Sequence, residues 1–306
     1  MAATPPLDET DEILDRLLIR YREEPVDLLG LGHAEGEYRY LASHREGYAR
    51  TLRHLLEHFR AADRKDVRIL EIGCFLGIVS IALARLGFRV TALDIPEFLA
   101  CPRLCARLNE SGVEALACNL KDYSLPFPEG AYDAVVMCET LEHLNFNPLP
   151  VVREINRVLK PGGLFYLALP NIASAANRAR LLRGESIHNP VRDFFAQLDP
   201  EKNMIVGLHW REYTRDEIRE MLEGMDFSIL RQTFHAEHPS GGAGGVFRRM
   251  VKRAVVRLLR WGPLRRLVFG CLLDEQADPA LSPLHVTLAR KERPCERALF
   301  LTEANR

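Results

Sequence analysis

The sequence predicts an α/β protein built on a doubly wound sheet of seven strands. Short segments rich in β-forming residues alternate with helical patterns, and the first five are almost continuously apolar. Parallel strands that are covered by helices on both faces are expected to be apolar in this way. The sixth and seventh segments have a different pattern. The expected strands are 68–73, 89–94, 114–119, 131–138, 164–170, 227–234 and 283–291.

The helical patterns end at recognisable signals. One ends at Gly87, a suitable C′ glycine, and another stops at Lys-Pro-Gly-Gly of 160–163. A third begins at Thr214, with Glu217 three residues later as a capping box, and ends near Gly224.

The expected organisation has four parts. Residues 8–24 and 44–62 are amphipathic and form an N-terminal helical cap, and the long segment 171–213 is an insertion on the substrate side. The four parts are a cap (1–62), a core with its insertion (63–240), a late basic helical insertion (241–275), and the last strand with a C-terminal tail (276–306).

Composition excludes several classes of protein. The formal net charge is −1, so no global field attracts nucleic acid. The first residues, MAATPPLDETDE, are acidic and lack an apolar run, which predicts neither a signal nor a transit peptide, and no stretch of 18 apolar residues occurs. The seven cysteines form no CxxC pair. We expect a cytoplasmic protein, with peripheral attachment at the inner membrane face as an alternative.

The turn after the first strand reads EIGCFLG (71–77). Gly73 allows a ligand to approach the backbone, and Gly77 starts a helix whose amides favour an anionic group. The second strand ends at Asp94, about 20 residues later, where an acid can accept hydrogen bonds from both ribose hydroxyls. The dinucleotide pattern G-x-G-x-x-G is absent, so the turn alone favours a ligand site and a plain strand–helix turn equally.

Downstream motifs resolve this ambiguity. The stretches NLKDYSLPFPEGAYDAVVMCETLEHL (119–144) and INRVLKPGGLFYLALPN (155–171) resemble class I S-adenosylmethionine-dependent methyltransferases. The resemblance covers roughly 65–235 and is strongest for bacterial glycan and small-molecule enzymes and for quinone-pathway O-methyltransferases. It implies a Rossmann-like fold and S-adenosyl-L-methionine as the cofactor.

The resemblance also implies roles for individual residues. Asp94 would bind the ribose hydroxyls, Ile95 would pack on adenine, and Asn119 would accept from the adenine amino group. The structural alternatives are helix caps or solvated strand ends for Glu71 and Asp94, an ordinary turn residue for Asn119 and a surface acid for Glu139. The implied cofactor-binding residues are Glu71, Gly73, Gly77, Asp94, Ile95, Asn119, Leu120 and Glu139.

The sequence departs from the family at Phe75, where most members carry a third glycine. A Phe does not comfortably adopt positive φ, so we expect the loop to turn differently or to stay in the β region there.

Methylation of a hydroxyl requires positioning and removal of its proton, and histidine suits that task near neutral pH. His143 and His209 are the candidate bases, with a packed histidine as the alternative for His143. His188 is a third candidate. The stretch E-T-L-E-H resembles one where acids hold a divalent ion in quinone-pathway enzymes, but two acids and a histidine are weak evidence, and we expect no metal site.

The segment GLHWREYTRDEI (207–218) resembles the H-x-R-x-[FY]-T stretch of glycan-type methyltransferases. Arg211 and Tyr213 would line the acceptor pocket together with Asn171, which follows the fifth strand. The alternative pairs Arg211 with an acid and buries Tyr213 in the core.

Residues 247–270 contain eight arginines and lysines and no acid, with apolar residues at helical spacing. A basic amphipathic helix suits an anionic membrane surface, which would favour a lipid-linked acceptor; a helix packed on the domain is the alternative. Nucleic acid is not expected, because no aromatic platforms are interleaved.

Together these observations predict a methyltransferase that O-methylates a hydroxyl of a glycan or other small molecule. The alternative is a binding or scaffold protein that kept the fold and lost turnover. The sequence predicts neither the acceptor nor the oligomeric state.

Overall fold

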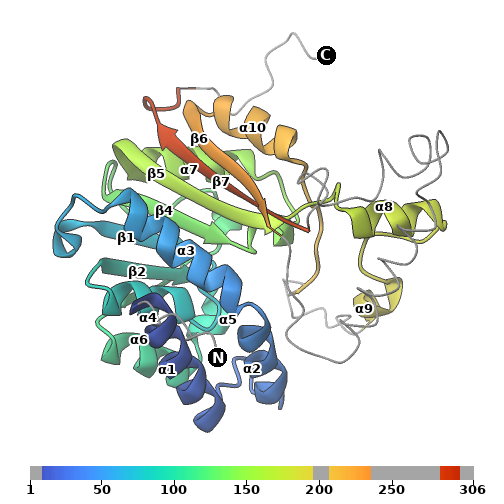
Figure 1. Ribbon diagram of the computed structural model, residues 1–306, viewed down its shortest axis with the longest axis horizontal. Helices are drawn as coiled ribbons and strands as arrows, with labels where there is room; N and C mark the ends of the chain where they lie inside the picture. Colours follow the sequence, from blue (N-terminus) through green and yellow to red (C-terminus); the bar gives the residue numbers. More distant parts are fainter. Residues whose placement is uncertain (1–8, 196–206, 236–282, 297–306) are drawn as a thin grey trace, which may run out of the picture.

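The computed structural model describes residues 9–195, 207–235 and 283–296. They form one seven-stranded sheet in the order β3-β2-β1-β4-β5-β7-β6 (Figure 1). The pairs β1–β2, β2–β3, β1–β4 and β4–β5 are parallel, whereas β7 lies antiparallel to both β5 and β6. The strands are Arg68–Ile72 (β1), Arg89–Asp94 (β2), Glu114–Ala117 (β3), Tyr132–Cys138 (β4), Leu159–Pro170 (β5), Phe227–His235 (β6) and Leu284–Lys291 (β7).

The fold class predicted from the sequence is confirmed, since each expected strand is present and the sheet carries helices on both faces. The α-helices are Glu9–Glu23 (α1), Ala34–Ser43 (α2), Arg45–His58 (α3), Ile78–Arg85 (α4), Pro96–Leu99 (α5), Pro102–Glu110 (α6), Leu149–Val158 (α7), Ala175–Leu182 (α8), Val191–Phe195 (α9) and Arg215–Glu223 (α10). The short 3-10 turns are Arg64–Asp66 (η1), Leu120–Asp122 (η2) and Leu141–His143 (η3).

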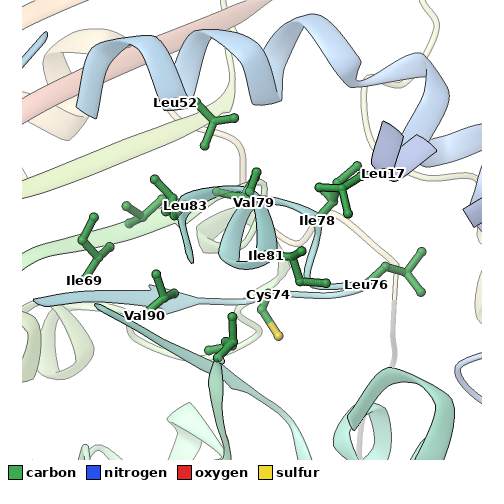
Figure 2. Packing of buried hydrophobic residues seen from close by; sticks show 14 of the residues in the cluster. Leu17, Leu52, Ile69, Cys74, Leu76, Ile78, Val79, Ile81, Leu83 and Val90 are labelled. Atoms are coloured by element: carbon green, nitrogen blue, oxygen red, sulfur yellow. The ribbon is translucent and has the colours of Figure 1, made fainter. Parts of the chain in front are cut away.

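Alternation along the strands separates two hydrophobic layers. Ile69 and Val136 face the layer that α1, α3, α4 and α6 cover, while their neighbours Leu70 and Val135 face the layer of α7 and α10. Figure 2 shows the first layer, in which Leu52 of α3 and Leu17 of α1 point toward the side chains of α4. Full burial of each such aliphatic side chain contributes about 1.5–3 kcal/mol, so this layer fixes the N-terminal helices to the sheet.

Several local predictions are confirmed as well. Helix α10 begins with the capping box of Thr214 and Glu217, in which each residue binds the backbone amide of the other. In contrast, α2 was not predicted, because its short sequence carries a weak amphipathic pattern. The Lys-Pro-Gly-Gly segment lies inside β5, with a register shift against β4, instead of standing before the strand.

The predicted basic insertion 241–275, including 247–270, lies outside the described residues, and the boundaries of the four expected parts stay predictions. Among the helices that the structure describes, none combines the length and apolarity needed to cross a membrane. Figure 1 shows α8 and α9 projecting away from the sheet, beyond the carboxyl end of β5. Ligands of open α/β sheets bind at this edge.

Candidate active site

A cavity of about 700 Å³ lies at the carboxyl ends of β1, β2, β4 and β5. Its volume falls within the range of small-molecule sites, roughly 300–1,000 Å³. Its other walls come from α2, α3 and the segment 207–212, so the N-terminal helices and the substrate-side insertion meet across the sheet edge. Most predicted site residues line it, namely Glu71, Gly73, Asp94, Ile95, Asn119, Leu120, Glu139, His143, Asn171 and His209.

Asp94, at the end of β2, organises the first loop. One carboxylate oxygen accepts from the amide of Phe75 (2.6 Å), and the other accepts from the amide of Ile95 (2.8 Å). Burial raises the pKa of Asp94 to about 6, against the opposing effect of these amides. The carboxylate therefore links the β1–α4 and β2–α5 loops at the cavity wall.

The prediction for Phe75 is wrong, because its φ is 49°, in the left-handed region. A non-glycine residue in a sparsely populated region costs about 1–3 kcal/mol. The hydrogen bond from its amide to Asp94 and edge contacts of its ring with Tyr40 and Phe98, at centroid distances of 5.4 and 5.7 Å, offset that cost. Phe75 thus takes the conformation that a glycine would take, and its ring lines the cavity.

Gly73 and Gly77 have different local roles. At Gly73, with φ +79°, a Cβ would come within 2.1 Å of the Thr140 hydroxyl, so the close approach of Thr140 already requires a glycine. Gly77 does not line the cavity; a Cβ there would meet Leu108 of α6 at 2.7 Å. The geometry therefore gives Gly77 a role in packing α4 against α6, while its neighbours Ile78 and Val79 reach the cavity.

Glu71 is 3% exposed and accepts a hydrogen bond from the Ser80 hydroxyl of α4. Burial raises the pKa of its carboxyl to about 8, against the opposing effect of the Ser80 hydrogen bonds. Without a ligand, this group is therefore mostly protonated near neutral pH. It holds α4 against the end of β1 at the back of the cavity.

Asn119 lies across the cavity and begins η2, where its side-chain oxygen accepts from the amide of Lys121 (3.0 Å). This hydrogen bond is the one that an ordinary turn residue, the alternative considered from the sequence, would make. Asn119 nevertheless also lines the cavity, together with Leu120. Glu139 follows β4 with φ 48°, a second left-handed non-glycine residue at the cavity, and its amide binds Ala168 (2.9 Å).

His143 and His209 come from distant parts of the chain and lie side by side in the cavity wall. The neighbour of His209, Leu208, contacts His143 across 65 residues of sequence. Their ring centroids lie 4.9 Å apart. His209 Nδ1 lies 2.9 Å from Glu212 Oε1, which raises the pKa of His209. His143 Nδ1 lies 2.9 Å from the Leu208 carbonyl, and burial lowers the pKa of His143. With a hydrogen on each Nδ1, both Nε2 atoms carry the lone pair that a base or ligand needs.

Glu142 is 0% exposed, and in the part of the chain that the structure describes neither carboxyl oxygen has a hydrogen-bond partner. Burial raises its pKa to about 7. Ligand atoms of Glu142, His143 and His209 lie within 4.8 Å of one another, so these residues could hold a divalent cation. The expectation of no metal site rested on the E-T-L-E-H stretch alone, and the sequence did not reveal that His209 would join it.

The three predicted acceptor residues are placed differently. Asn171 is buried at the cavity wall, where its amide donates to the Pro283 carbonyl (2.7 Å). Arg211 is 62% exposed, pairs with Glu217 at 2.9 Å and lies over the Tyr213 ring at 5.0 Å. Tyr213 is 4% exposed and belongs to the core, so neither lines the cavity. The capping box at Thr214 explains this, because Glu217 attracts Arg211 away from the cavity.

Sequence reasoning missed several residues of this site. Glu212 orients His209 and accepts from Asn177 (3.1 Å), and its position three residues after a histidine was a usable signal. His44 and Tyr48 line the cavity from the N-terminal helices, which resemblance to the core alone could not place. Exposed His188 does not line the cavity.

Comparison with known proteins agrees with this architecture. Residues 70–167 match the family model described as a methyltransferase domain. Ubiquinone biosynthesis O-methyltransferase of Xanthomonas campestris pv. campestris is 36% identical over 121 residues, which are 39% of this chain and 50% of the relative. The protein of the same name from Xanthomonas oryzae pv. oryzae is 34% identical over 126 residues, or 41% and 52% of the two chains. The chain thus spans about half the length of these curated relatives.

A solved structure described as the [4+2]-cyclase SpnF covers 92% of this chain and 96% of its own, with a TM-score of 0.51 at 20% identity. This likeness shows the shared fold, and the name shows that the fold does not by itself fix the reaction.

Proposed function

We propose that this chain, whose residues 70–167 are a class I S-adenosylmethionine-dependent methyltransferase domain, transfers a methyl group to a hydroxyl of a small molecule or glycan. The observation that carries the proposal is the cavity itself. It combines a carboxylate at the end of β2 with two histidines on the opposite wall, across a volume suited to a cofactor and an acceptor together. The two relatives are named as O-methyltransferases, in agreement with a hydroxyl acceptor.

The residues present fit S-adenosylmethionine. Asp94 offers carboxylate oxygens at the position where ribose hydroxyls bind, and Ile95 and Leu120 offer apolar contact for the adenine ring. Glu139 and Glu71 supply carboxyl groups at the part of the cavity that would face the methionine end. The cofactor supplies an electrophilic methyl group on a sulfonium. The rest of the reaction depends on what the chain does with the acceptor.

The acceptor must be held in line with that methyl group, and its hydroxyl must lose a proton. We assign this proton transfer to His209, because Glu212 fixes its Nδ1 hydrogen and leaves Nε2 as the acceptor atom. His143, whose ring packs edge-on against His209, orients the same group. The hydrogen bond to Glu212, and to a smaller extent the charge of Glu142, stabilise positive charge on His209 and raise its pKa.

The cation-binding arrangement of Glu142, His143 and His209 supports a second form of the same function. A divalent cation held there would lower the pKa of a bound hydroxyl, so the histidines would act as ligands. Dialysis against a chelator followed by activity assays with added Mg²⁺ or Zn²⁺ separates the forms. Unchanged activity in chelator supports proton removal by His209 alone. Loss of activity in chelator and its restoration by one metal supports a bound cation.

An acceptor screen tests the proposal as a whole. Purified protein is incubated with methyl-labelled S-adenosylmethionine and a panel of hydroxylated small molecules and glycans, and products are detected by mass spectrometry. Titration calorimetry with S-adenosylhomocysteine is run in parallel. Absence of cofactor binding would refute the proposal. Binding without transfer to any acceptor would favour a scaffold protein that has lost turnover.

A lipid-linked acceptor and attachment to an anionic membrane surface remain part of the proposal through the basic segment 247–270. Co-sedimentation with vesicles containing anionic lipid at low salt tests it, and protein left wholly in the supernatant would refute it. Neutral vesicles are the control.

A further inference from the structure

A second cavity of about 60 Å³ adjoins the main one. This is several times the roughly 10–15 Å³ that one water needs, so a small polar group fits. The residues His44, Tyr48, Cys138 and Glu139 line both cavities, and the floor of the second is formed by Ala168 of β5 and Leu284 of β7. A molecule bound in the main cavity can therefore extend past Tyr48 and Glu139 into the second.

Arg50 of α3 lines this second cavity. Within the described ranges it has no hydrogen-bond or ion-pair partner, whereas its neighbours on the same helix are paired. Arg45 contacts Asp15 at 2.7 Å, and Arg53 contacts Asp11 at 2.6 Å. The Arg50 side chain is half-buried, and this burial lowers its pKa. Because an arginine stays charged at physiological pH, a partly buried one without a counter-ion is unfavourable.

The groups around Arg50 favour an anion of low charge. One turn before Arg50 on the same helix, Glu46 already pairs with Arg45 at 3.0 Å. Glu139 contributes one negative charge to the cavity wall. Behind Arg50, the imidazoles of His54 and His235 have pKa values lowered to about 4, first by burial and then by the charges of Arg50 and Arg231. The Arg231 guanidinium lies 3.5 Å from Glu57. Both imidazoles are therefore neutral near pH 7. Among the described groups behind Arg50, the one carboxylate is that of Glu57, which pairs with Arg231, and Glu139 opposes a dianion.

We propose that the second cavity binds a carboxylate group of the methyl acceptor, with Arg50 as its counter-ion. The planar guanidinium matches a carboxylate with two parallel hydrogen bonds. The hydroxyl of Tyr48, for which the described residues offer no hydrogen-bond partner, lies at the junction of the two cavities and donates to the same group or to the atom beside it. This inference deepens the proposed function and rests on it, since it names a chemical feature of the acceptor.

Acetate is the probe for a direct test. The full chain, ¹⁵N-labelled at arginine, is titrated with sodium acetate at constant ionic strength, and the guanidinium signals are followed by NMR. We compare Arg50→Gln, Arg50→Lys and the matched control Arg53→Gln, one turn along the same helix. We expect acetate to shift the Arg50 signal, Arg50→Gln to weaken binding at least about tenfold, Arg50→Lys to weaken it less, and Arg53→Gln to bind as the unaltered protein does.

Three results of the acetate titration would overturn the inference, and a fourth comes from a titration with inorganic phosphate. The three are an unshifted Arg50 signal, equal binding by Arg50→Gln, or equal weakening by Arg53→Gln. If inorganic phosphate binds more tightly than acetate, the cavity prefers a dianion to a carboxylate, and the assignment is refuted. Thermal unfolding of each variant confirms folding, and Arg50→Lys keeps the test valid if Arg50→Gln does not fold. Calorimetry with S-adenosylhomocysteine on the same samples tests the proposed function separately, because acetate binding requires neither cofactor nor turnover.

Discussion

The two halves of the main cavity differ in how their polar groups are satisfied. On the cofactor side, Asp94 accepts from two backbone amides, Glu71 from Ser80 and Asn119 from its own turn. On the acceptor side, the described residues leave both carboxyl oxygens of Glu142 and the indole nitrogen of Trp210 buried without a hydrogen-bond partner.

The difference indicates which half is complete before a ligand binds. Buried polar groups without partners are rare in native proteins, because each one costs about 1–3 kcal/mol. The cofactor half sits on strand ends and needs little rearrangement. The acceptor half joins η3 to the last residues of the insertion through the Glu142 carbonyl, which accepts from the Trp210 amide at 2.7 Å. A ligand or ion that satisfies the acceptor half would complete the site.

The largest effect is expected for His209→Ala, which removes the assigned base. A positioned base contributes roughly 10²–10⁴-fold to a rate, so kcat should fall by that amount with S-adenosylhomocysteine affinity nearly unchanged. Steady-state kinetics and calorimetry measure the two quantities. Glu212→Gln, which keeps a hydrogen bond but loses the charge, should lower kcat by about tenfold. The exposed His188→Ala is the control, and retention of full kcat by His209→Ala would contradict the assignment.

Asp94→Ala tests the cofactor half. Charge-assisted hydrogen bonds contribute about 1.5–3 kcal/mol each, so the loss of two to the ribose should weaken S-adenosylhomocysteine binding at least about 100-fold. Because the pKa of Asp94 is about 6, affinity in the unaltered protein should also fall as the pH drops below that value. Titration calorimetry between pH 5 and 8 measures both. The exposed Asp122→Ala serves as control, and unchanged binding by Asp94→Ala would remove Asp94 from the cofactor site.

The same division separates the features that the sequence could predict from those that it could not. The strands and the positions of Asp94 and Glu71 follow from local apolar runs and strand ends, which depend on residues close in the chain. The meeting of His143 with His209, and of Arg50 with the second cavity, depends on how distant segments pack. Arg211, predicted to line the acceptor pocket, pairs instead with Glu217 of the capping box, which competes for its guanidinium. Local pattern carries no information on such competition.

Glu71→Gln tests how far burial controls the cofactor half. The folded pKa of about 8 lies above the 4.5 of an unperturbed glutamate, so the neutral acid stabilises the fold fully below pH 4.5, and this contribution is lost as the pH rises through 8. The amide of Gln keeps an acceptor for Ser80 and does not ionise. Relative to the unaltered protein, the variant should therefore gain about 2 kcal/mol between pH 6.5 and 9. Urea unfolding of the ligand-free proteins measures it, with exposed Glu97→Gln as control. Parallel pH profiles would show that Glu71 does not titrate in this range.

The smallest effect is expected at Phe75, and it tests whether the cofactor loop stores strain. With φ at 49°, glycine should be more stable than alanine at this position by about 1 kcal/mol, because both substitutions lose the ring contacts with Tyr40 and Phe98 but only alanine keeps the strained Cβ. At an ordinary helical or extended position the order would be reversed. Urea unfolding of Phe75→Gly and Phe75→Ala gives the difference directly. If alanine proves the more stable, the loop does not use the left-handed conformation. The Phe75→Gly variant can be the more stable of the two and still bind S-adenosylhomocysteine no tighter than the unaltered protein. That result would show that the Phe75 ring and the hydrogen bond from its amide to Asp94 already hold the loop in its binding conformation.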